Sequence, residues 1–247
     1  MDRMKLYKMK LLTPALSIAA AVLLLNACDD GGGYSLDNAW YSIATVTPLS
    51  DDTYSLTLDN GTTLWPAATN APGYRAEHRQ RASVVYTILS DAFQGYDHAV
   101  KVLDIRNVLT KAPAKDLGEK NEEEYGRDPV EILNMWIGDG YLNIEFGFSS
   151  GSMGVIHYVN LVKMDNAATP YSYEFRHNAY GDHTLYAQKG IVAFDLSDLI
   201  PGGDEIELTV KFNTFEGEVE RKISFKPLGA NHYGTEIGAA TYTADIR

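Results

Sequence analysis

The sequence predicts an all-β protein in which a small five-stranded barrel precedes an antiparallel β-sandwich. Short alternating or β-branched apolar runs recur after residue 34, and Gly, Pro, Asn and Asp residues separate them. No segment has the 3.6-residue periodicity of a long amphipathic helix. A proline-bounded, charged stretch divides the runs into two groups, which indicates two domains.

Residues 1–27 have the layout of a lipoprotein signal peptide. Basic residues precede an apolar run from Leu11 to Leu25, and the chain's single cysteine, Cys28, follows Ala27. The run contains Pro14 and is shorter than the roughly 20 apolar residues that a membrane-spanning helix needs. An ordinary secretory signal would not explain a cysteine at the cleavage point. We therefore expect a diacylglycerol on Cys28 and a flexible tether over residues 28–37, so that the lipid holds the protein on a membrane.

Asp29 and Asp30 follow the expected lipid site directly and resemble the acidic signals that send some lipoproteins to the outer face of the outer membrane. We expect an outer-membrane lipoprotein of the cell envelope. The periplasmic and the surface-facing leaflet both stay open.

The charge of the chain narrows the classes of partner. Without residues 1–27, 17 basic and 32 acidic residues remain, a net charge of -15. Such a surface repels phosphate backbones, so we expect no nucleic-acid partner. One cysteine allows no internal disulfide. We expect no cofactor, a membrane contact only through the lipid on Cys28, and an unidentified protein, peptide or glycan as ligand.

The first predicted domain spans residues 38–115 and contains five strands. These are expected at residues 40–47, 54–58, 62–65, 83–89 and 99–105. Asp59, Asn60 and Gly61 form the turn of a hairpin, because Asn and Gly tolerate positive φ. Five short antiparallel strands in one small unit suit a partly open barrel of the OB type, which closes most of its sheet edge.

Arg75, Arg79 and Arg81 lie close together in this domain, and OB folds often bind single-stranded nucleic acid. Residues 34–117 nevertheless carry 7 basic and 9 acidic side chains, so their net charge is -2. We therefore interpret the three arginines as part of a solvated turn.

Residues 116–129 are predicted to be a linker. The run from Glu119 to Glu124 is almost wholly charged or polar, and Pro129 ends the stretch. A charge run of this kind is typical of a solvated connector.

The second predicted domain spans residues 130–247 and reads as about seven strands of an antiparallel sandwich. They are expected at residues 132–137, 141–148, 155–163, 171–176, 190–196, 206–215 and 219–226. Gly138, Asp139 and Gly140 form a three-residue hairpin loop, and residues 197–200 form one helical turn.

Several segments resemble the NigD-like lipoproteins, in the order in which that family has them. They are residues 58–66 (LDNGTTLWP), 86–88 with 100–102, 135–144 (MWIGDGYLNI) and 176–182 (RHNAYGD). The resemblance covers nearly the whole mature chain and implies an N-terminal OB-type domain and a C-terminal β-sandwich. For function it implies only a link to bacteriocin immunity, drawn from the bacteriocin operon of the founding member. It brings no catalytic residues.

Three patterns are candidates for chemical sites. Residues 147–151 fit the G-x-S-x-G pattern of a nucleophile elbow, but a strand-like run follows where a helix is needed. His177, Asp182 and His183, with His157 from a neighbouring strand, are weak candidates for a zinc site, but their spacing is not that of known zinc motifs. Glu205 and Glu207 share one face of a strand and are expected to be solvated.

We therefore expect a lipid-anchored envelope binding protein, of bacteriocin-immunity type if the resemblance holds, with Cys28 as its lipidation site and neither catalytic nor metal-binding residues. The alternative is an envelope hydrolase or glycan-processing enzyme.

Overall fold

In the computed structural model, residues 34–151, 154–165, 169–182, 184–199 and 204–226 are described. The predicted signal peptide, Cys28 and His183 lie outside them. Within the described part of the chain, no helix has both the length and the apolar character that a membrane span requires.

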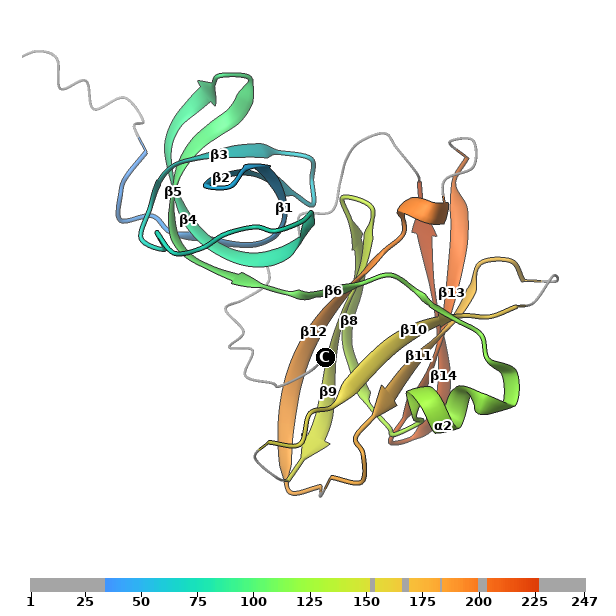
Figure 1. Cartoon of the computed structure of the whole chain (residues 1–247). Helices are drawn as coiled ribbons and strands as arrows, with labels where there is room; N and C mark the ends of the chain where they lie inside the picture. The colour runs from blue at the N-terminus through green and yellow to red at the C-terminus, as the bar shows by residue number, and fades with distance from the viewer. Residues whose placement is uncertain (1–33, 152–153, 166–168, 183, 200–203, 227–247) are drawn as a thin grey trace, which may run out of the picture. The chain divides into compact units, whose positions relative to one another are not determined.

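The first five strands form a closed barrel in the order β1-β2-β3-β5-β4 (Figure 1). The strands are β1 (Trp40–Ser50), β2 (Thr53–Leu58), β3 (Thr63–Thr69), β4 (Gln80–Phe93) and β5 (Tyr96–Asn107). β1 pairs with both β2 and β4, which closes the sheet, while β3 and β5 run parallel. The five-stranded barrel predicted from the sequence is confirmed, but it is closed where a partly open barrel was expected, and the β3–β5 pair is parallel where all pairs were expected to be antiparallel.

The barrel core follows from the alternation of side chains along its strands. Ala44 and Val46 of β1 point inward with Leu56 of β2, and all three are fully buried. Gly61 has φ 85°, which is the left-handed conformation expected for the turn between β2 and β3.

The second half is a sandwich of two sheets. One has the order β14-β13-β11-β10-β7 and the other β6-β12-β9-β8 (Figure 1). The strands are β6 (Leu109–Lys111), β7 (Ala114–Lys115), β8 (Glu131–Gly138), β9 (Tyr141–Ser150), β10 (Tyr158–Lys163), β11 (Ser172–Asn178), β12 (Tyr186–Asp195), β13 (Ile206–Thr214) and β14 (Gly217–Phe225). The predicted sandwich is confirmed, but its sheets are mixed. β7–β10, β6–β12 and β11–β13 are parallel pairs.

The sandwich core lies between the two sheets. Leu208, Val210 and Phe212 of β13 are fully buried and belong to the same apolar cluster as Ile144 and Phe146 of β9. The predicted hairpin between β13 and β14 is present, with Thr214 opposite Gly217. The helical turn expected at residues 197–200 is a 3₁₀ turn, η2 (Ser197–Leu199).

The strand pairing around residue 110 differs from the expected domain limits. β6 and β7 lie in the segment assigned from sequence to the first domain, but they pair with sandwich strands β12 and β10. The segment expected to be a plain linker contains η1 (Gly118–Lys120) and α2 (Asn121–Tyr125). Glu122, Glu123 and Glu124 are exposed as predicted, whereas Asn121 is buried because its side chain bonds to Asp116 and to the backbone of Leu117.

The turn between β8 and β9 is one residue shorter than predicted. Gly138 pairs with Tyr141, which leaves only Asp139 and Gly140 in the loop. Their φ values are 44° and 82°, and a two-residue turn with both φ positive matches the twist of a hairpin.

Candidate functional site

β9 is buried on both of its faces, which identifies a second packing surface on the sandwich. Its even-numbered residues face the sandwich core, whereas Tyr141, Asn143 and Glu145 lie on the other face and are also buried. The barrel and the sandwich belong to one compact unit, Ser35–Arg247. A separate apolar cluster joins them: it consists of Ile43, Val108, Trp136, Tyr141, Ile191 and Ala193, with Tyr41 against it.

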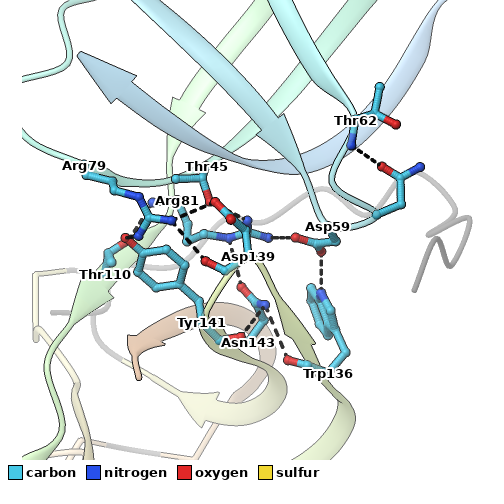
Figure 2. Close-up of polar contacts among 11 residues, drawn as sticks. Thr45, Asp59, Thr62, Arg79, Arg81, Thr110, Trp136, Asp139, Tyr141 and Asn143 are labelled. Atoms are coloured by element: carbon cyan, nitrogen blue, oxygen red, sulfur yellow. Dashed lines mark hydrogen bonds and ion pairs between the residues drawn. The ribbon is translucent and has the colours of Figure 1, made fainter. Parts of the chain in front are cut away.

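Arg81 is the centre of a polar network at this junction, and its side chain is fully buried. In β4 it lies directly opposite Thr45 of β1, so both side chains emerge on the outer face of the barrel. The guanidinium donates to Thr45 Oγ1 at 2.9 Å and to Asn143 Oδ1 at 3.3 Å, and it forms an ion pair with Asp59 (Figure 2). It also lies 5.6 Å from the centre of the Tyr141 ring.

Asp59 connects this network to the sandwich. Its second carboxylate oxygen accepts a hydrogen bond from Trp136 Nε1 at 2.7 Å (Figure 2). One carboxylate thus forms an ion pair with a buried cation of the barrel and accepts a hydrogen bond from a buried N–H group of the sandwich. A charge removed from water is tolerated only when it is paired and hydrogen-bonded in this way.

Arg79 forms a second, more exposed contact between the same two elements. It donates to Tyr141 Oη at 2.7 Å and to the Asp139 carboxylate at 2.8 Å (Figure 2). Asp139 occupies the two-residue turn, so the tight hairpin places its carboxylate where Arg79 reaches it.

The interpretation of the three arginines as a solvated turn is wrong for Arg81 and incomplete for Arg79. Arg75 is an exposed side chain that pairs with the exposed Asp52. Alternation along β4 supplies a local signal, because Arg81, Ser83 and Val85 occupy every second position and so share the outer face of the barrel. That face is covered by the second domain, which strand periodicity alone does not reveal.

The histidines considered for zinc do come together. His157 Nδ1 lies 2.9 Å from His177 Nε2, and His157 Nε2 lies 3.1 Å from Asp182 Oδ2. Both histidines are almost fully buried. His157 lies directly before β10 (Tyr158–Lys163), the strand that pairs with β11.

The three groups form a line, however, and do not converge on a point. His177 and Asp182 contact opposite nitrogens of His157, so each ring nitrogen of His157 is already used. In the described residues, no group of three or more His, Cys, Asp or Glu side chains is arranged to hold a metal ion. The arrangement is a hydrogen-bond chain.

The direction of each hydrogen bond in this arrangement depends on the tautomers of the two histidine rings. Burial, with His157 nearby, lowers the pKa of His177 to about 4, so the ring is neutral at neutral pH.

The G-x-S-x-G segment does not form a nucleophile elbow in the described residues. Ser149 lies within strand β9 opposite Ala187, and Ser150 donates to Asp182 Oδ2 at 3.1 Å. Asp182 therefore lies between the serine and the histidine, which is not the order of a catalytic triad. Glu205 and Glu207 are exposed, and Glu207 pairs with Lys222.

Comparison with known families matches residues 43–108 to the NigD-like N-terminal OB domain and residues 113–226 to the NigD-like C-terminal beta sandwich domain. The chain belongs to the NigD-like family. A comparison with curated proteins gave no match.

Solved structures agree with this assignment. A protein from Parabacteroides distasonis described as toxin-related is 44% identical with a TM-score of 0.71, over 76% of this chain and 94% of that chain. A Bacteroides vulgatus protein of unknown function is 25% identical with a TM-score of 0.62, over 83% and 96% of the two chains. A NigD-like immunity protein from Bacteroides caccae shares the fold at 20% identity, with a TM-score of 0.61 over 79% of this chain and 100% of that one.

Proposed function

We propose that the protein is a lipid-anchored binding protein of the cell envelope, of bacteriocin-immunity type, that acts without catalysis. The observation that carries this proposal is the position of the only cysteine, Cys28, directly after an apolar run and before an acidic, glycine-rich stretch. That context fits a lipid anchor on the outer membrane. The leaflet on which the protein acts is open to test.

Two further observations support a binding role. The Parabacteroides distasonis relative, described as toxin-related, is similar enough for its description to bear on this chain. The polar groups that the fold gathers are engaged with one another: Arg81 and Asp59 are paired, and His157 uses both ring nitrogens. These groups stabilise a fixed surface, which suits recognition of a ligand.

The anchor is tested by membrane partitioning of Cys28→Ala. We expect the variant to leave the detergent phase, because two acyl chains on Cys28 supply the anchoring free energy. Partitioning that survives the substitution would overturn the lipoprotein assignment.

The immunity role is tested by the survival of a sensitive strain that expresses the protein and is challenged with a bacteriocin. We expect wild type to protect and Cys28→Ser to lose protection, because the released protein loses its high local concentration at the membrane. His177→Gln keeps a polar side chain in the buried hydrogen-bond chain, so this variant should protect like wild type. Loss of activity in a folded His177→Gln protein would favour an enzyme instead.

A further inference from the structure

The barrel carries an aromatic cluster that the junction does not use. The Trp65 ring of β3 lies 6.4 Å from that of Phe93 and 5.3 Å from that of Tyr96, measured between ring centroids. Phe93 and Tyr96 are the last pair of the β4–β5 hairpin, which extends beyond β1, β2 and β3 in Figure 1. All three side chains are only partly buried, so part of each ring meets solvent.

The hairpin tip has a backbone conformation that must be held in place. Ala92 and Gln94 have φ of 42° and 50°, in the left-handed region that residues with a Cβ avoid. Such conformations persist only where surrounding contacts hold them, and they are frequent at ligand sites. Phe93 lies between these two residues, and its packing on Trp65 is such a contact. The rings are therefore arranged before any ligand arrives, which lowers the entropy cost of binding.

A carboxylate next to the tip of the hairpin ties β5 to β3. Asp97 Oδ2 accepts hydrogen bonds from the Thr63 backbone N–H at 2.7 Å and from the Thr63 hydroxyl at 2.8 Å. These bonds lower the pKa of Asp97, so the group is charged at neutral pH. They also fix its position relative to the aromatic cluster.

The surroundings of the rings are negatively charged. Asp91 and Asp97 are both exposed, and Asp91 contacts His98 at 2.9 Å. No Lys or Arg occurs in residues 63–69 or 89–98, and Lys101 of β5 lies further along the strand, opposite Ala68 of β3. The faces of aromatic rings are also electron-rich, so rings and carboxylates favour the same sign of charge in a ligand.

We propose that Trp65, Phe93 and Tyr96, with Asp91 and Asp97, form a docking site for the lysine or arginine side chains of a basic polypeptide partner. The proposal rests on the binding function proposed above and names the chemistry of its ligand. Without the signal peptide the net charge is -15, which would steer a basic partner toward the protein, and residues 34–117 contribute -2 of it. A neutral glycan would also stack on the rings, but it would gain nothing from the charge.

The three tryptophans provide a direct test. In the ¹⁵N-labelled full chain, purified in detergent micelles, each tryptophan contributes one indole N–H signal, assigned by single Trp→Phe substitutions. Hexalysine should shift the Trp65 signal saturably. Trp40 is 47% exposed but lies outside the cluster, so its signal reports non-specific attraction and should stay in place. Trp136 is bonded to Asp59, so its signal reports that the junction is intact.

Two substitutions locate the site. Phe93→Ala and Asp91→Asn should each weaken hexalysine binding about two- to fivefold, the range for one exposed cation–π or charge contact. Asp104→Asn is the matched control, because Asp104 is an exposed carboxylate of the same hairpin paired with Arg106. It should leave the affinity unchanged. An unshifted Trp136 signal in each variant shows that the fold is kept.

Several results would overturn the docking site. They are equal shifts of Trp40 and Trp65, no shift with hexalysine, an Asp104→Asn effect as large as that of Asp91→Asn, or a Trp65 shift with cellohexaose alone. If hexalysine fails while the anchored protein still protects cells, only this site is refuted. If hexalysine binds at Trp65 but no protection is seen, the site stands and the immunity function fails.

Discussion

Asp59 in the barrel accepts a hydrogen bond from the indole of Trp136 in the sandwich at 2.7 Å, although 77 positions separate them in sequence. The same carboxylate pairs with the fully buried Arg81. The two domains therefore share one polar centre, and its parts should depend on one another energetically.

Trp136→Phe keeps an aromatic ring in the apolar cluster but removes the indole donor. We expect a loss of about 1–3 kcal/mol in the free energy of unfolding, because the buried carboxylate loses a partner. Chemical denaturation measures it. Trp40→Phe is the control, since Trp40 is half-exposed, and should change stability by less than about 0.5 kcal/mol. Equal effects of the two substitutions would contradict the role of this bond.

Arg81→Met should destabilise the protein by about 3–5 kcal/mol, because it leaves Asp59 without its cation in a buried setting. Adding Asp59→Asn should recover part of that loss, since the unpaired charge is then gone. Arg106→Met is the control, because its ion pair with Asp104 is exposed and should contribute less than about 1 kcal/mol. A double variant whose loss equals the sum of the single losses would show that the pair is not coupled.

Gly138→Ala tests how closely the domains approach. A Cβ at this position would lie 2.0 Å from Asp59 Oδ1, so the carboxylate or the hairpin must move. We expect a destabilisation of about 1–3 kcal/mol, measured by thermal unfolding. Gly73→Ala meets no atom within 4 Å and should be nearly neutral. A Gly138→Ala variant as stable as wild type would mean that Asp59 does not lie against this turn in solution.

Acid should destabilise the protein through His177. Its pKa is about 4 in the folded state against 6.5 normally, because it is buried beside His157. Below pH 6.5 the unfolded state takes up a proton that the folded state refuses. Stability should therefore fall by up to about 1.4 kcal/mol per pH unit, roughly 3 kcal/mol in total, before levelling below about pH 4.

The measurement is denaturation at a series of pH values for wild type and His177→Gln. All other titratable groups are common to the two proteins, so the difference between the two curves isolates His177. The variant should lose less stability between pH 6.5 and 4. Parallel curves would show that His177 titrates normally in the folded protein.

The boundary between the domains is tested with two fragments. Residues 109–247 contain β6 and β7, which pair with sandwich strands, whereas residues 130–247 lack them. We expect the longer fragment to unfold cooperatively and the shorter one to be less stable, because two strand edges lose their partners. Both fragments expose the junction face of β9, so lower solubility than the whole chain is expected. If residues 130–247 alone match the longer fragment in stability, β6 and β7 contribute little.

Local sequence patterns were sufficient to predict the strands, the hairpin turns and the fold class. Alternation of Leu208, Val210 and Phe212 with polar residues predicts a strand with one buried face, and β13 has that form. Asn60 and Gly61 predict a hairpin turn because few residues tolerate positive φ, and the turn is there. These signals depend only on neighbours in the chain.

The tertiary structure decided which strands are buried on both faces. It also decided which polar groups meet on the second buried face. A two-residue period predicts that Arg81 and Thr45 lie on the outer face of the barrel. It does not predict that the sandwich covers this face. Likewise, the sequence gives His157, His177 and Asp182 as candidate metal ligands. Only their positions in space show that they lie in a line. The physical reason is the same in both cases. Burial and hydrogen-bond direction are set by residues distant in sequence, whereas strand and turn formation are set by adjacent ones.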